Sequence, residues 1–120
     1  MEQRNRPTTI LIHSAPYGQK DPAEALDLSM VLATFDFKVN LIFCGDGIYG
    51  LLKNQQPDKQ KCYTATYKSL PFYDVDPIYV RKSDMLKQNL TDLDLICPVT
   101  SLDDQAVNKL IQTSLQVWNF

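Results

Sequence analysis

Short apolar runs alternate along the chain with longer segments that are apolar at helical spacing. Residues 8–14, TTILIHS, and 38–44, KVNLIFC, have the length and β-branched composition of buried strands. Residues 78–80 and 93–99 predict two further strands, although Pro98 limits ladder pairing in the second. Apolar runs of strand length that alternate with helical segments predict a mainly parallel sheet.

Polar residues between these runs mark the predicted starts of helices. Asp21 can cap a helix, and Pro22 suits the first helical position. Similar signals predict three more helix starts: Asp46-Gly47 before residues 48–54, Ser83-Asp84, and a capping box at Ser101-Leu102-Asp103-Asp104. Residues 64–70 are helical or irregular in the same pattern.

The helix that starts at Asp21 is apolar on two sides. Its apolar residues fall into two stripes, with Leu26, Met30, Ala33 and Phe37 in one and Ala25, Leu28, Leu32 and Phe35 in the other. A helix that is apolar on two sides is buried on two sides. One side would cover the sheet, and the second stripe predicts a contact with another subunit.

The fold expected from this alternation is α/β. With 120 residues, 44% hydrophobic and 22% charged, the chain has the size and composition of one globular domain. We expect residues 1–120 to form that domain, with residues 1–7 as a flexible tail. Right-handed crossovers place helices on both faces, which predicts a three-layer α/β/α arrangement with a sheet of about five strands. The pattern leaves the strand order open.

Charge and composition narrow the possible partners. The net charge is −2 and the pI about 5.2, so composition gives no basic face for nucleic acid. No apolar run approaches the roughly 20 residues that span a bilayer. The N-terminus, MEQRNRPTT, has no apolar signal region, and the three cysteines are widely spaced. These features predict a cytoplasmic protein with reduced cysteines and no membrane contact.

The sequence lacks the patterns of two common kinds of site, the phosphate-binding loop and the metal site. Residues 15–18, APYG, follow the first strand but contain one glycine, whereas phosphate-binding loops need several; this argues against a free-standing flavodoxin-like domain. Metal ligands are limited to His13 and three scattered cysteines without a C-x-x-C pair. We therefore expect neither a cofactor nor a metal.

The cysteines leave competing interpretations open. Cys44 ends a strand in FCGDGIY, where open α/β sheets bind ligands, and a Cys44–His13 nucleophilic pair is possible if the first two strands are neighbours. Burial as a small apolar residue is the alternative. Cys62 follows Lys59 and Lys61, whose charges lower a thiol pKa if it is exposed, and Cys97 reads as inert core.

Three segments together resemble one family. They are Ser14-Ala15-Pro16-Tyr17-Gly18, then Phe43-x-x-Asp46-Gly47-Ile48-Tyr49, and finally residues 63–70, YTATYKSL, with YDVD at 73–76. On these segments the chain, from about Thr8 to Phe120, resembles the DsrE/DsrF-like sulfur-relay family, and most closely its TusC (DsrF) branch.

The resemblance implies a subunit of a cytoplasmic TusBCD-type complex. Homologous TusB-like and TusD-like subunits would be its partners in a heterohexamer, with upstream and downstream sulfur carriers and no direct nucleic-acid contact. The complex passes persulfide sulfur toward 2-thiouridine at the tRNA wobble position. A DsrEFH-type subunit in sulfur oxidation is one alternative, and a subunit that carries persulfide on Cys44 or Cys62 is another.

The family's relay cysteine belongs to the TusD/DsrE-type subunit, at a place that corresponds here to residues 77–81. This chain has Tyr79 there. The resemblance therefore implies a structural or binding subunit of a sulfurtransferase complex with no catalytic residue of its own. In this interpretation Asp46-Gly47 is a turn at the start of a helix, and the Asp46 carboxylate accepts amide hydrogen bonds there. The aromatic residues suit either an interface or the core: Tyr63, Tyr67, Phe72, Tyr73 and Tyr79.

Overall fold

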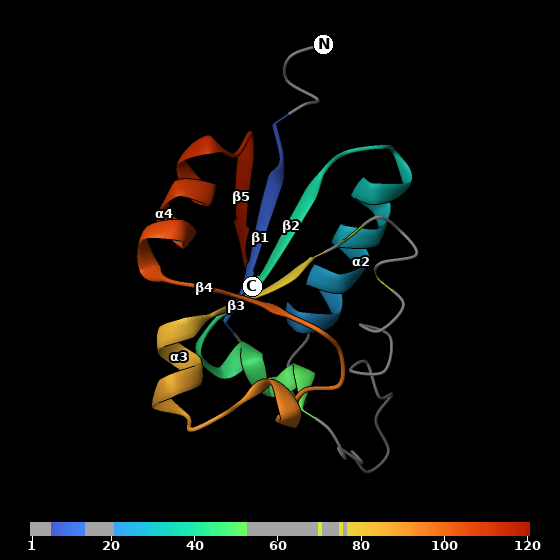
Figure 1. Cartoon of the computed structure of the whole chain (residues 1–120). Coiled ribbons are helices and arrows are strands. Elements are labelled where there is room, and N and C mark those ends of the chain that lie inside the picture. Colours follow the sequence, from blue (N-terminus) through green and yellow to red (C-terminus); the bar gives the residue numbers. More distant parts are fainter. Residues whose placement is uncertain (1–5, 14–20, 53–69, 71–74, 76) are drawn as a thin grey trace, which may run out of the picture.

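A five-stranded parallel sheet forms the centre of the computed structural model, which describes residues 6–13, 21–52, 70, 75 and 77–120 (Figure 1). The strands are β1 (Thr8–Ile12), β2 (Val39–Phe43), β3 (Ile78–Arg81), β4 (Thr100–Leu102) and β5 (Gln116–Asn119). Their order is β4-β3-β2-β1-β5, and every neighbouring pair is parallel. The predicted mainly parallel sheet is therefore confirmed.

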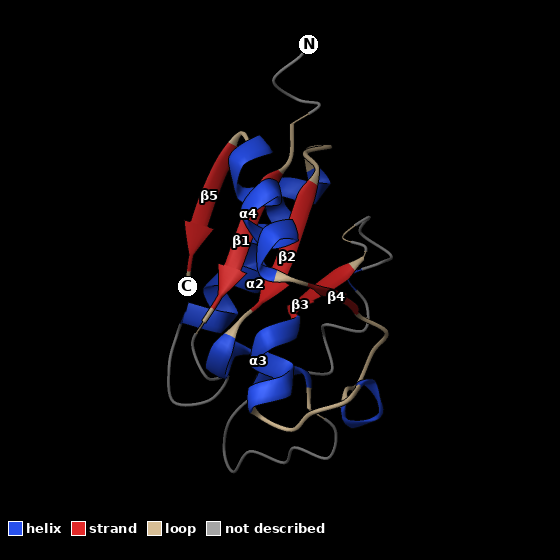
Figure 2. Ribbon diagram, turned by 60° about the vertical axis from the view of Figure 1, so that its left-hand side comes forward, coloured by secondary structure: helices blue, strands red, loops and turns tan. Residues whose placement is uncertain are grey.

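Helices cover both faces of this sheet, which confirms the three-layer α/β/α arrangement (Figures 1 and 2). The helical elements are α2 (Asp21–Thr34), the 3-10 helix η1 (Gly45–Leu51), α3 (Lys82–Lys87), the short 3-10 helix η3 (Asp92–Asp94) and α4 (Asp104–Thr113). α2 lies against one face and α4 against the other. The chain moves stepwise from β1 to β4 and then returns past β1 to β5, so right-handed connections carry α4 to the opposite face.

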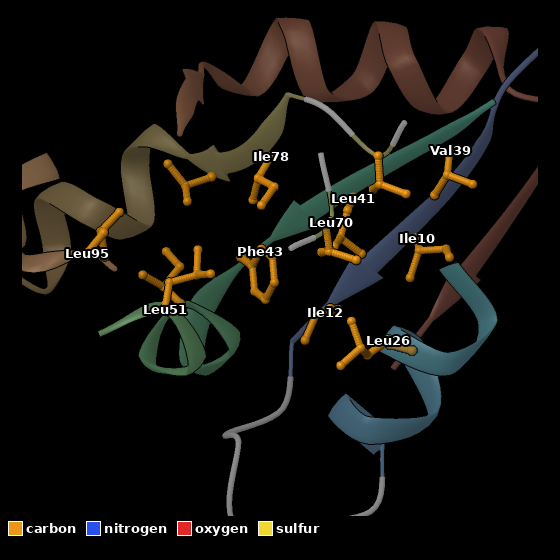
Figure 3. Close-up of a cluster of buried hydrophobic side chains, with 14 of the residues drawn as sticks. Ile10, Ile12, Leu26, Val39, Leu41, Phe43, Leu51, Leu70, Ile78 and Leu95 are labelled. Carbon is orange, nitrogen blue, oxygen red and sulfur yellow. The ribbon is translucent and has the colours of Figure 1, made fainter. Parts of the chain in front are cut away.

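Alternating strand residues divide the apolar core between the two faces. On the α2 side, Figure 3 shows Ile10 and Ile12 from β1 beside Leu41 and Phe43 from β2 and near Leu26 of α2. On the α4 side the buried cluster is smaller: Leu11, Ile42, Cys44 and Val107. Because both faces of β1 and β2 are buried, these strands read as continuous apolar runs in the sequence.

The predicted strand over residues 93–99 is wrong. The fourth strand is β4, which begins directly after residue 99, and η3 stands at the start of the segment that was predicted as a strand. Asp94 Oδ2 accepts a hydrogen bond at 2.9 Å from the backbone amide of Thr91, which favours a tight turn there. Leu95 forms only an isolated antiparallel bridge with Leu52, and Pro98 has no amide to donate to a ladder.

Two predicted caps lie inside other elements. The helix α4 is capped by Asp103, whose carboxylate accepts from the Ala106 amide at 2.8 Å, whereas Ser101 belongs to β4. The predicted capping box is therefore shifted by two residues. Likewise α3 starts at Lys82, with Arg81 as its N-cap, so Ser83 and Asp84 lie in the first turn.

The ends of the other elements differ little from the prediction. The helix predicted over residues 48–54 begins earlier, as η1, and β1 and β2 are each five residues long. At the N-terminal side, where a tail was predicted, Arg6 Nη2 donates to Ser114 O at 2.7 Å and Pro7 O accepts from the Leu115 amide at 2.8 Å. These bonds anchor the last two residues of the predicted tail.

The second predicted stripe of α2 is only partly at the surface. Ala25 is fully buried, Leu28 and Leu32 pack half-buried against the core, and Phe35 is 64% exposed. Val31, which precedes Leu32 in the chain, reaches solvent with 53% of its surface exposed. No helix in the described part of the chain is long and apolar enough to cross a membrane.

Candidate functional site

The carboxyl ends of three neighbouring strands meet one side of α4 around a cavity of about 250 Å³. Open α/β sheets commonly bind ligands at this edge, which makes the cavity the candidate site. Its lining comes from β1, β2, β3 and α4: Leu11, His13, Cys44, Arg81, Asp104, Val107, Asn108 and Ile111.

The turn after β2 fixes Cys44 by backbone contacts. The Cys44 amide donates to Ile12 O at 2.9 Å, and Cys44 O accepts from the Gly47 amide at 2.8 Å. A Cβ on Gly47 would lie 2.0 Å from Ile12 O, so the turn approaches β1 too closely for any other residue. Gly45 has a φ of +50°, in the left-handed region that glycine adopts without strain. The turn therefore favours glycine at both positions, Gly45 for its φ and Gly47 for its close approach to β1.

The carboxylate that holds the start of this turn comes from α3. Asp84 Oδ2 accepts from the Gly45 amide at 2.8 Å, and Gln88 Nε2 donates to Gly45 O at 2.9 Å. Asp46, the residue expected to accept an amide hydrogen bond here, is exposed in the first turn of η1. The structure thus gives the role of amide acceptor at Gly45 to Asp84, a residue 39 positions away.

The guanidinium of Arg81, which lines the cavity, is shared between two carboxylates. Arg81 Nε donates to Asp104 Oδ1 at 2.9 Å, and Arg81 Nη1 lies 3.9 Å from Asp84 Oδ2. Ser83 Oγ also donates to Asp104, at 3.2 Å. The hydrogen bond from Arg81 and then that from Ser83 lower the pKa of Asp104. Because Arg81 is already neutralised, this arrangement offers no free positive charge to an anion.

The Cys44 thiol is held in its protonated form. Its side chain is buried, and burial raises the pKa to about 11; the negative charge of Asp84 adds to this rise, whereas Arg81 opposes it. At pH 7 the thiolate fraction is then on the order of 10⁻⁴, and the thiolate is the form that attacks sulfur. The environment therefore suppresses the reactivity that the position of Cys44 had suggested.

The structure brings His13 and Cys44 to the same cavity without making a catalytic pair of them. Strands β1 and β2 are neighbours, as a pair would require, and both residues line the cavity. His13 Nε2, however, lies 3.1 Å from Asn119 Oδ1 in an exposed hydrogen bond. The Nε2 atom of His13 is thus hydrogen-bonded to Asn119 of β5 and does not serve as a base for the Cys44 thiol.

The other candidate residues lie elsewhere. Cys97 is half-buried against the α2-side core, in an irregular segment instead of the predicted strand. Tyr79 is half-buried in β3 and packs against the cluster that contains Cys44. Within the described ranges, no group of three His, Cys, Asp or Glu side chains is placed to hold a metal. Several candidates lie outside the described residues: Cys62, the loop 14–18 and the aromatic residues Tyr63, Tyr67, Phe72 and Tyr73.

Sequence reasoning missed the charged network of Arg81, Asp84 and Asp104. Arg81 ends β3, while the two carboxylates stand in the first turns of α3 and α4. The available signal was their position just after predicted strands, because those ends meet at one edge of a parallel sheet. The local sequence pattern instead predicts only helix-capping roles for Asp84 and Asp103-Asp104.

Comparisons with known proteins agree on the relationship. The model of the DsrE/DsrF-like family matches residues 7–120. A TusC homologue from Pseudomonas aeruginosa is 33% identical over 110 residues, which cover 90% of this chain and 92% of the relative. TusC from Buchnera aphidicola subsp. Baizongia pistaciae is 30% identical over 108 residues, covering 88% and 91%. The crystal structure of the ychN protein from E. coli matches with a TM-score of 0.83 at 20% identity, over 96% of this chain and 99% of that one, which shows a shared fold.

Proposed function

This chain belongs to the DsrE/DsrF-like family, and from that membership we propose that it is a structural and binding subunit of a TusBCD-type sulfur-relay complex that carries no relay sulfur itself. Its similarity to TusC proteins over about nine-tenths of its length supports the assignment to a sulfur-relay subunit.

The observation that carries the non-catalytic part of the proposal is the setting of Cys44. A relay cysteine must form a thiolate and meet a partner's persulfide, whereas Cys44 is 3% exposed with a pKa raised to about 11. Tyr79 supports the same conclusion, because the family resemblance implies that segment 77–81 corresponds to the place of the relay cysteine in the TusD-type subunit. A phenol cannot carry a persulfide.

The proposed pathway follows the TusC assignment. In it, TusB-like and TusD-like subunits join this chain in a cytoplasmic heterohexamer, which takes persulfide sulfur from an upstream carrier. A downstream carrier receives that sulfur for 2-thiouridine formation at the tRNA wobble position. The net charge of −2 supports a role without direct RNA contact, because RNA binding draws on clustered cations.

Sulfur transfer by a cysteine-free subunit tests the proposal. Cys44, Cys62 and Cys97 are replaced together by Ser, and the variant is co-expressed with the TusB-like and TusD-like subunits of the source organism. We expect the assembled complex to transfer ³⁵S-labelled sulfur to the downstream carrier at the wild-type rate. Native mass spectrometry first establishes that the variant assembles, and single Ser variants are the controls for packing defects at Cys44.

A second candidate function, a persulfide-carrying subunit, is favoured by one observation. Cys44 lines the cavity at the carboxyl edge of the sheet, where ligands of this fold class bind. This function predicts a labelled persulfide on the isolated subunit after incubation with the upstream carrier. It also predicts loss of transfer in an intact complex that contains the Cys44→Ser variant, and that pair of results would replace the first proposal.

A further inference from the structure

The two helices that cover opposite faces of the sheet have different outer surfaces. The outer face of α4 is polar, as expected for a helix in contact with water, and its exposed residues include Gln105, Asn108, Lys109 and Gln112. The outer face of α2 instead exposes Val31 by 53% and Phe35 by 64%. α4 therefore presents a polar face to solvent, whereas α2 has an apolar outer surface without a partner among the described residues.

Val31 and Phe35 form one continuous surface. Residues four apart lie one above the other on a helix. Although α2 ends at Thr34, the Phe35 amide donates to Val31 O at 3.3 Å and to Leu32 O at 3.1 Å, which keeps Phe35 in the last turn. Leu28 and Leu32 flank the pair, half-buried against the core. The exposed apolar area is thus backed by packed side chains, as in the centre of a protein interface.

The same side of α2 carries negative charge. Glu24 and Asp27 are exposed, and Asp27 precedes Val31 by one turn. The sequence of α2, DPAEALDLSMVLAT, contains no lysine or arginine. The outer face of α2, defined as Glu24, Asp27, Val31 and Phe35, therefore combines two carboxylates at one end with two apolar side chains at the other.

We propose that the outer face of α2 is the docking surface for a homologous subunit of the relay complex, which presents an apolar patch beside a lysine or arginine. This inference rests on the proposed function. Charge complementarity determines the partner, since the carboxylates of Glu24 and Asp27 need a cationic counterpart when they approach another protein. A second copy of the same face would add two more carboxylates and no cation, so a different subunit is the better fit.

The central experiment replaces both apolar residues by lysine. Val31→Lys with Phe35→Lys removes the apolar contact and places two positive charges against the partner's apolar patch, close to its basic side chain. Lysine near the carboxyl end of a helix is favourable, so the variant keeps its fold, and an unchanged circular dichroism melting curve establishes this. We expect its affinity for the other subunits to fall roughly 30-fold or more.

A matched control adds the same charges to the polar helix. Gln105→Lys with Gln112→Lys introduces two lysines on the outer face of α4, at exposed positions. We expect this variant to assemble with wild-type affinity. A third variant, Glu24→Gln with Asp27→Gln, should slow association and flatten its dependence on salt, because it removes the screened attraction alone.

The outcomes separate the inference from the function on which it rests. If the wild-type chain does not assemble with TusB-like and TusD-like subunits, the proposed function fails. If it assembles and the Val31→Lys, Phe35→Lys variant assembles equally well, the function stands and the docking surface is wrong. If the isolated chain forms a dimer that this variant dissociates, the occupant is a second copy, and that result also overturns the inference.

Discussion

The carboxylate of Asp84 accepts a hydrogen bond at 2.8 Å from the backbone amide of Gly45. This bond joins the first turn of α3 to the start of η1, although the two residues are 39 positions apart. The same carboxylate raises the pKa of the Cys44 thiol next to that turn. Asp84 thus links the conformation of the turn to the chemistry of the cysteine.

Replacement of Asp84 should separate these two effects. Asp84→Ala leaves the Gly45 amide without its acceptor, and we expect the free energy of unfolding to fall by about 1–3 kcal/mol. Asp84→Asn keeps an oxygen that can accept the bond but removes the charge, so it should be less destabilising while it lowers the pKa of Cys44. Urea unfolding and thiol titration measure the two quantities. Equal stability of both variants would show that the bond contributes nothing.

The close approach of η1 to β1 makes Gly47 the least replaceable glycine of the turn. In Gly47→Ala the new Cβ would lie 2.0 Å from Ile12 O, a backbone atom that cannot move without disturbing β1. We expect a loss of about 3 kcal/mol or more, at the upper end for single substitutions.

Gly45→Ala is the matched control for that substitution. No atom lies within 4 Å of the position of its Cβ, so only the φ of +50° opposes alanine, at a cost of about 1–2 kcal/mol. Thermal unfolding should rank Gly47→Ala well below Gly45→Ala. The reverse order would mean that conformational strain outweighs steric contact in this turn.

The start of α4 offers a test of the corrected cap. Asp103→Ala removes the carboxylate that accepts from the Ala106 amide and should cost about 0.5–2 kcal/mol of stability. Ser101→Ala, at the residue that the sequence pattern had assigned to the cap, should change stability by less than about 0.5 kcal/mol, since Ser101 is exposed in β4. Comparable losses in both variants would contradict the observed cap.

Cys44 should make stability depend on pH in the alkaline range. Its pKa rises from 9.0 to about 11 on folding, so the protonated thiol is favoured in the folded state. The contribution of Cys44 to stability is fully present below pH 9, where both states hold the proton, and is lost as the pH rises through 11. At pH 11 the free energy of unfolding is lower by about 2 kcal/mol.

Other groups titrate in the same range, so the measurement is the difference between the wild type and Cys44→Ala. Urea unfolding at pH 8 and at pH 10.5 should show the wild-type advantage shrinking at the higher pH. A difference that stays constant with pH would place Cys44 in a solvent-like environment. A rapid reaction of the native thiol with a disulfide reagent at pH 7 would lead to the same conclusion.

The buried strands were predictable because most of their residues are apolar. β1 and β2 are covered on both faces, so their apolar runs needed no periodicity to be recognised. In β3, the buried Ile78 and Val80 alternate with the half-buried Tyr79 and Arg81. β4 is different, because its three residues, Thr100–Leu102, are exposed or half-buried at the sheet edge. An edge strand without an apolar run resembles a loop in the sequence, whereas the apolar residues 93–99 have the pattern of a strand.

The candidate site was predictable only in part, for a related reason. That Cys44 and His13 lie near one sheet edge follows from two consecutive strands that end there. The hydrogen bonds that Gly45 donates to Asp84 and that Arg81 donates to Asp104 depend on which strands are neighbours and on which turn of a helix each residue occupies. Local sequence signals predict a capping role for Asp84 and Asp104, whereas in the folded chain Asp84 accepts a hydrogen bond from Gly45 and Asp104 accepts one from Arg81.

The pairing of β1 with β5 also governs the order in which the sheet can be completed. Thr8 of β1 lies opposite Gln116 of β5, 108 residues later in the chain. While a ribosome is still making the intervening residues, one edge of β1 has no strand to pair with, although its residues are among the most buried in the finished sheet. A nascent chain truncated before Gln116 therefore exposes an apolar strand edge, the kind of surface that aggregates or recruits chaperones.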